Sequence, residues 1–195
     1  YWKIFNRPMS DEERKRWEWS QSKKDEDHGK MIEAICAFVR TTGMKVLVCP
    51  EDSSHMEIGF ESIVKKLPPD VREKTVWRET FWLTDEAVSV YERAFALLSL
   101  DMHSPIMALG RGVPAIVCRF SEQTTKGFMW RDIGLDSWLF DLDEEKDGSR
   151  IKAALLGIAA DPQGARKRAA EALAFVKKRQ KETMAVLRHE LGLRP

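Results

Sequence analysis

Short apolar runs alternate with helix-like periodicities through the middle of this chain. The apolar runs lie at 45–49, 75–77, 95–100, 114–118 and 138–140. They are short and bounded by Gly, Pro or polar residues, which is typical of buried strands. Apolar residues at helical spacing occupy 29–42, and helix signals recur between the runs. Because parallel strands need helical crossovers, this order predicts an α/β fold with a Rossmann-like doubly wound parallel sheet.

The two ends of the chain have different patterns. Residues 10–28 are densely charged without a core-facing period, which indicates a solvated helix or a mobile loop. Residues 144–193 are rich in Ala, Lys, Arg and Glu, and Asp161-Pro162 divides them into two helices. We therefore expect a charged N-terminal segment at 1–28, which could include a remnant of a first strand, an α/β domain at 29–160, and a long C-terminal helix at 161–195.

Composition narrows the class of protein. The chain has 195 residues, of which 43% are hydrophobic and 32% charged, so it can bury the core of one domain. A net charge of +1 lacks the basic excess of a general nucleic-acid binder. No apolar stretch approaches the ~20 residues of a membrane span, and no signal peptide begins the sequence. Three cysteines in apolar runs are typical of free thiols in a reducing compartment, so we expect a cytoplasmic protein.

The candidate site follows from the predicted sheet. Ligands of open parallel sheets bind beyond the carboxyl ends of the strands. There, Ser104-Pro105 begins a helix directly after a buried strand, and free N–H groups at a helix start suit an anion. His103 stands beside them and could contact a phosphate or donate a proton. The alternative is a structural histidine that binds a neighbouring loop.

Further candidates lie in the other loops at this edge. Lys126 and Arg119 could hold a phosphate over the strand ends, although each could equally be an ordinary surface cation. Glu51 could be a base or a hydrogen-bond acceptor, with helix capping as the alternative use of its loop. The sequence has no HExxH or CxxC motif, no GxGxxG or Walker spacing and no GxSxG elbow. We therefore expect neither a metal nor a cofactor.

Residues 90–142 resemble the C-terminal half of the polysaccharide pyruvyl transferase family. The matching text is SLDMHSPIMALGRGVPAIV, then Lys126, then RDIGLDSWLFDLD. The resemblance implies one lobe of a glycosyltransferase-B-like architecture of two Rossmann-like lobes, with the active site between them. It implies transfer from phosphoenolpyruvate to a carbohydrate hydroxyl in exopolysaccharide biosynthesis. His103 would then be the general acid or a phosphate contact, and Lys126 the loop lysine that handles the donor.

Two features shape these expectations. Asp101 stands where the family has an arginine, and a carboxylate there repels the anion that an arginine would bind; Arg78, Arg111 or Arg119 could replace that cation. The chain begins with Tyr1 and not with Met, so we expect a missing N-terminal lobe. Two alternatives stay open, namely a lobe of a nucleotide-sugar glycosyltransferase and a non-catalytic, partner-binding member of the family.

Overall fold

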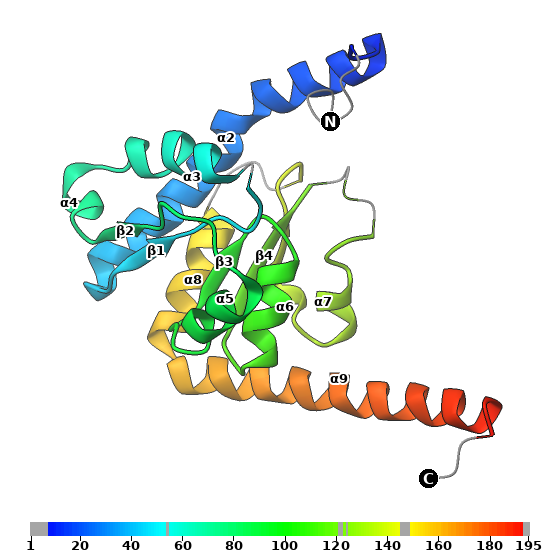
Figure 1. Ribbon diagram of the computed structural model, residues 1–195. Coiled ribbons are helices and arrows are strands. Elements are labelled where there is room, and N and C mark those ends of the chain that lie inside the picture. The colour runs from blue at the N-terminus through cyan, green and yellow to red at the C-terminus, as the bar shows by residue number, and fades with distance from the viewer. Residues whose placement is uncertain (1–7, 54, 121–122, 124, 145–148, 193–195) are drawn as a thin grey trace.

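Helices and parallel strands alternate in the computed structural model, which describes residues 8–53, 55–120, 123, 125–144 and 149–192 (Figure 1). The elements in chain order are α2 Asp11–Thr42, β1 Val46–Val48, α3 His55–Ser62, η1 Val64–Lys66, α4 Pro69–Arg72, β2 Thr75–Trp77, α5 Thr84–Tyr91, β3 Leu97–Ser99, α6 His103–Gly110, β4 Ala115–Arg119, α7 Met129–Asp132, η3 Asp136–Trp138, β5 Leu139–Asp141, α8 Ser149–Ala160 and α9 Pro162–Glu190. Each of the five apolar runs of the sequence thus overlaps a strand.

The strands are parallel, as predicted, but they form two hydrogen-bonded sheets among the described residues. β1 pairs with β2, and β3, β4 and β5 form the second sheet in that order. A single doubly wound sheet was expected. The two sheets are instead joined by side chains, because Glu51, which follows β1, binds the backbone and imidazole of residues that follow β3. The structure therefore shows an α/β fold with two small parallel sheets and a long C-terminal helix.

The core lies around β4, the middle strand of the larger sheet. Every residue of β4 is buried. α6 packs against β3 and β4, while α8 packs against α2 (Figure 1). Since helices cover both faces, the short strands read as continuous apolar runs in the sequence. This burial holds the loops at the carboxyl ends of the strands in place.

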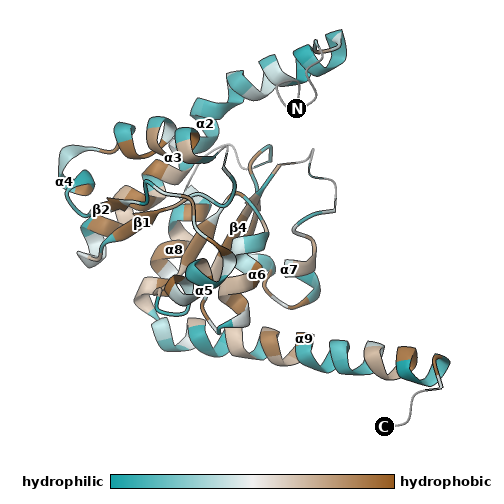
Figure 2. Cartoon of the chain, in the orientation of Figure 1, coloured by the Kyte–Doolittle hydropathy of each residue, from teal (hydrophilic) through white to brown (hydrophobic). Residues whose placement is uncertain are grey.

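The charged N-terminal segment is the first half of one long helix. Ser10 begins α2 with a capping box, in which the Ser10 Oγ accepts from the Glu13 N–H at 3.2 Å and the Glu13 carboxylate accepts from the Ser10 N–H at 2.8 Å. The helix then continues without a break through residue 29. Its first turns project from the body as a hydrophilic rod (Figure 2). The first-strand remnant, expected within 1–28, has no counterpart at 8–28, and residues 1–7 lie outside the described ranges.

The long C-terminal helix begins where the sequence predicts. Asp161 caps α9 by accepting from the Gly164 N–H at 2.9 Å, and Pro162 takes the first helical position. The face that meets the body is narrow, because its buried residues are Ala165, Ala169 and Ala172. From residue 177 onward the described part of the helix is exposed, and it extends well past the body (Figure 1). Within the described residues, no helix has the length and apolarity needed to span a membrane.

Candidate functional site

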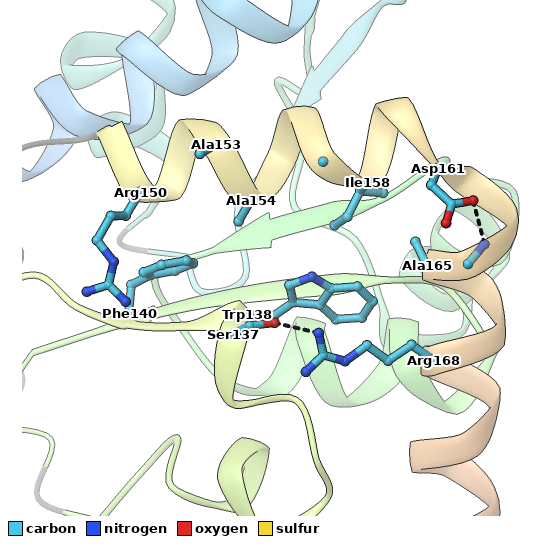
Figure 3. Close-up of a pocket in the computed structure, with 12 residues that line it drawn as sticks. Ser137, Trp138, Phe140, Arg150, Ala153, Ala154, Ile158, Asp161, Ala165 and Arg168 are labelled. Atoms are coloured by element: carbon cyan, nitrogen blue, oxygen red, sulfur yellow. Dashed lines mark hydrogen bonds between the residues drawn. The ribbon is translucent and has the colours of Figure 1, made fainter.

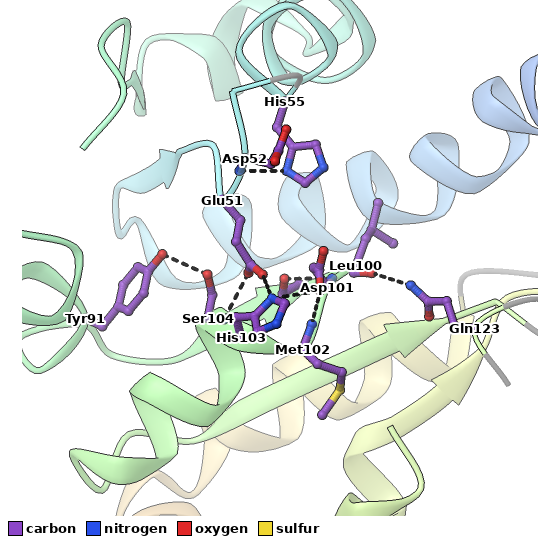
Figure 4. A network of polar contacts seen from close by, with 11 residues as sticks. Glu51, Asp52, His55, Tyr91, Leu100, Asp101, Met102, His103, Ser104 and Gln123 are labelled. Atoms are coloured by element: carbon purple, nitrogen blue, oxygen red, sulfur yellow. Dashed lines mark hydrogen bonds and ion pairs between the residues drawn. The ribbon is translucent and has the colours of Figure 1, made fainter. Parts of the chain in front are cut away.

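Three titratable side chains meet at the carboxyl ends of β1 and β3 (Figure 4). The His103 Nδ1 lies 2.7 Å from the Glu51 Oε1 and 3.5 Å from the Asp101 Oδ1. We refer to Glu51, Asp101 and His103 as the carboxylate–imidazole cluster. All three were candidates in the sequence. The structure brings together Glu51, which follows β1 of one sheet, and Asp101 and His103, which follow β3 of the other.

A tight turn after β3 places two of these side chains. The Ser99 Oγ accepts from the Asp101 N–H at 3.0 Å, and the Asp101 Oδ1 accepts from the Met102 N–H at 2.6 Å. α6 begins at the next residue, His103. Short polar side chains that bind nearby backbone in this way favour turns over continued strand. The turn therefore fixes the Asp101 carboxylate beside the first residue of α6.

The start of α6 already holds an anionic group from the protein itself. The Glu51 Oε2 accepts from the Ser104 N–H at 2.9 Å, so a carboxylate occupies the place that helix N-termini offer to anions. The Glu51 side chain is only 14% exposed. We expected donor anions to bind at Ser104. In this structure the Ser104 N–H is bound to Glu51.

The imidazole of His103 faces outward. Its side chain is 73% exposed, and Glu51 engages the Nδ1 side of the ring. Within the described residues the Nε2 has no hydrogen-bond partner. A carboxylate that accepts from Nδ1–H fixes the tautomer in which Nε2 can accept a proton. This arrangement can therefore exchange a proton with a molecule bound over the strand ends.

Tyr91 contacts Ser104, the residue after His103, and it was not among the residues that the sequence indicated. The hydroxyl of buried Tyr91 lies 2.9 Å from the Ser104 Oγ. Burial raises the pKa of Tyr91 to about 12 and that of the neighbouring Cys49 thiol to about 11. Tyr91 lies on α5, where a sequence shows only a core aromatic residue. Nothing in its local pattern indicates contact with the site.

Alkaline pH should destabilise the protein through these two groups. The folded state keeps both protons where the unfolded chain, with reference pKa values of 10.0 for Tyr91 and 9.0 for Cys49, loses them. Stability contributed by the protonated forms is therefore lost as pH rises from about 9 to about 12. Melting temperatures measured from pH 8 to 11 should fall less steeply for Tyr91→Phe than for the wild type. Equal slopes would contradict this assignment.

The two candidate cations follow β4 and have different surroundings. The Arg119 side chain is buried, and its guanidinium binds the Asp141 carboxylate of β5. Its Nε also donates to the Lys126 backbone oxygen at 2.9 Å, and the group lies over the Phe128 ring. Arg119 thus has a structural partner set at the position where we expected a donor contact. The Lys126 side chain is exposed at the surface.

The carboxylate–imidazole cluster has the donor atoms of a metal site. One ligand atom from each of its residues lies within 4.8 Å of the other two. Carboxylate oxygens and an imidazole nitrogen are ligands that divalent transition metals accept. Among the described residues, neither Glu51 nor Asp101 forms an ion pair with Lys or Arg. Within the described part of the chain, the imidazole of His103 is therefore the one nitrogen-bearing side chain that contacts these two carboxylates.

A hollow lies away from the cluster, between β5 and α8 (Figure 3). Its volume is about 490 Å³, and its walls include Trp138, Phe140 and small residues of α8. Arg150 stacks over Phe140, while Arg168 stacks over Trp138 and donates to the Ser137 Oγ at 2.5 Å. The hollow is mainly apolar, and the described residues that line it include Asp161 but no histidine that could exchange a proton with it. We therefore locate the candidate chemistry in the carboxylate–imidazole cluster.

Comparisons of the chain with protein-family models, with curated proteins and with solved structures gave no match.

Proposed function

We propose that the chain is a lobe of a carbohydrate-directed transferase that takes a group from an anionic small-molecule donor. Phosphoenolpyruvate is the donor that the resemblance of residues 90–142 implies. One observation carries the proposal, namely the exposed His103 imidazole held by the Glu51 carboxylate at 2.7 Å, at the carboxyl end of β3. Ligand sites of parallel α/β sheets lie at this edge.

The proposed roles follow from the geometry of the pair. Glu51 orients the ring through Nδ1, so His103 exchanges protons with the substrate through Nε2. A sugar hydroxyl must lose its proton when it bonds to a donor carbon, and a neutral imidazole within hydrogen-bond reach accepts it. The imidazolium can then give that proton to C3 of the donor, whose C2–C3 double bond is consumed as the new C–O bond forms at C2. A second sugar hydroxyl then displaces the phosphate, which leaves with the proton of that hydroxyl and completes the ketal. The hydrogen bond to Glu51 orients the ring, and His103 is the first residue of α6.

The donor also needs a cation, and Lys126 is the one that fits. Arg78 lies 3.6 Å from Glu86 and stacks on Trp82, and Arg111 lies 3.9 Å from Glu92. The exposed Lys126 ammonium forms no ion pair within the described residues. It follows the strand next to β3, on the same edge of the sheet as His103. We assign it to the anionic group of the donor.

Phosphoenolpyruvate should perturb the site in solution. At millimolar ligand, we expect the amide resonances of His103, Ser104 and Ile106 to shift in a ¹⁵N–¹H correlation spectrum of the 195-residue chain. His103→Gln and Lys126→Ala should each reduce the shifts, because they remove a donor contact. His189→Gln, at an exposed position of α9, is the matched control and should leave them unchanged. An absence of shifts in the wild-type protein would reject this donor.

Two other functions predict different results. A lobe of a nucleotide-sugar glycosyltransferase should gain thermal stability from a UDP- or GDP-sugar, with amide protection near residues 78–85. A non-catalytic, partner-binding protein should show neither response, and His103→Ala should leave every activity of the full-length protein intact. Asp101 is the observation that favours this second alternative, since it adds a negative charge where an anion would bind.

A further inference from the structure

We propose that Glu51, Asp101 and His103 form a binding site for a divalent transition-metal ion such as Mn²⁺ or Zn²⁺. The proposal concerns the carboxylate–imidazole cluster itself, and its geometry stands without any assigned donor. An ion on the Nδ1 of His103 would leave the ring proton on Nε2, so the ion-bound form is an alternative to the form in which His103 accepts a proton. Its use as a positive charge that attracts an anionic donor rests on the proposed function.

Distances within the cluster suit one shared ion. Metal–ligand bonds to carboxylate oxygen and imidazole nitrogen are about 2.0–2.2 Å long, so two ligand atoms of one ion lie at most about 4.4 Å apart. The His103 Nδ1 is 2.7 Å from the Glu51 oxygen and 3.5 Å from the Asp101 oxygen, and both separations fall inside that span. The third separation, between the two carboxylates, is within 4.8 Å, so a small movement of one side chain brings all three ligands to one ion. An ion between the three groups would take the place of the proton that His103 now shares with Glu51.

The two carboxylates of the cluster would also be stabilised by a bound cation. Glu51 is largely buried, and burying a carboxylate is unfavourable unless a charge or several hydrogen bonds compensate it. Its only ionisable side-chain partner among the described residues is His103, and the same imidazole faces Asp101. One imidazole thus lies against both carboxylates. A divalent ion balances both carboxylates and leaves the ring neutral, which is the state in which imidazole coordinates metals.

The ligands are held in place before any ion arrives. The second oxygen of Glu51 is fixed by the Ser104 N–H, and the Asp101 carboxylate is fixed by the Met102 N–H (Figure 4). These backbone donors act as an outer shell that orients the ligands. Because Glu51 comes from the β1–β2 sheet and the other two residues follow β3, an ion would also tie the two sheets together.

Titration with MnCl₂ tests the site directly, because a bound paramagnetic ion broadens nearby resonances. In the 195-residue chain without any donor, amides of residues 51–52 and 101–104 should broaden at substoichiometric Mn²⁺. Asp101→Asn and Glu51→Gln should each weaken binding by about tenfold or more, which calorimetry with ZnCl₂ measures independently. Asp132→Asn, at an exposed carboxylate of α7, is the matched control and should keep wild-type affinity.

The outcomes separate the ion from the donor. Broadening spread evenly over exposed acidic residues, or broadening unchanged in both cluster variants, would overturn the site. If Glu51→Gln unfolds, as its capping of α6 allows, Asp101→Asn decides alone. Mn²⁺ broadening without any phosphoenolpyruvate shift in the presence of Zn²⁺ would support the ion and reject the donor. A phosphoenolpyruvate shift with no metal response would do the reverse.

Discussion

Asp141→Ala should lower the free energy of unfolding by about 3–5 kcal/mol, the usual cost of removing one partner from a buried ion pair. Asp141 and Arg119 are neighbours in the register of β4 and β5, and their side chains are 7% and 5% exposed. The substitution leaves the guanidinium charge buried between the sheet and Phe128 without its carboxylate. Urea unfolding followed by fluorescence measures the loss.

Two further variants sharpen this result. Asp132→Ala removes an exposed carboxylate of α7 and should stay within about 0.5 kcal/mol of the wild type. Replacing the pair together, as Arg119→Met with Asp141→Leu, should recover much of the lost stability, because no charge is then stranded. A loss below about 1 kcal/mol for Asp141→Ala would show that solvent reaches Arg119, and it would return Arg119 to the set of donor contacts.

Trp130→Ala should cost about 3–5 kcal/mol as well, through a different mechanism. Trp130 is 1% exposed, and its indole N–H donates to the Ala115 backbone oxygen at 3.0 Å. Truncation leaves a cavity beside β4 and a buried carbonyl without that donor. The same urea unfolding experiment gives the size of the effect.

The neighbouring residues supply the controls for Trp130. Trp130→Phe keeps most of the apolar volume but loses the hydrogen bond, so we expect a smaller loss, with about 1 kcal/mol from the bond itself. Met129→Ala changes an exposed side chain on the same short helix and should have little effect. If Trp130→Ala were no worse than Met129→Ala, α7 would not be a fixed part of the core.

Local pattern was enough to place the strands and the helix breaks. Proline has no backbone N–H and a fixed φ, so it marks the ends of regular elements in a sequence. β4 begins directly after Pro114, and α9 begins at Pro162, directly after its cap Asp161. The first half of α2 could not be assigned between helix and loop, because its charged residues have no core-facing period. Its capping box, Ser10 with Glu13, was the missed signal. The separation into two sheets depends on strand spacing, which periodicity does not encode.

The site was predictable residue by residue but not as an arrangement. The rule that ligands bind at the carboxyl ends of strands selected Glu51, Asp101, His103 and Ser104. Which of these side chains touch one another depends on how closely β1 lies to β3 in space, although the two strands are about fifty residues apart in the sequence. For this reason no short sequence motif marks the carboxylate–imidazole cluster. The partner of Arg119 is likewise set by the β4–β5 register, so the sequence alone showed only an arginine after a strand.

The way α9 packs gives its two ends different stability against local unfolding. The buried contacts of that helix are made by three alanines near its start, and from residue 177 onward the described part is exposed to solvent. The outer turns owe their form to the intrinsic preferences of Ala, Lys, Arg and Glu, which are marginal for an isolated helix in water. We therefore expect the outer turns of α9 to unfold locally at a lower free energy than the α/β body.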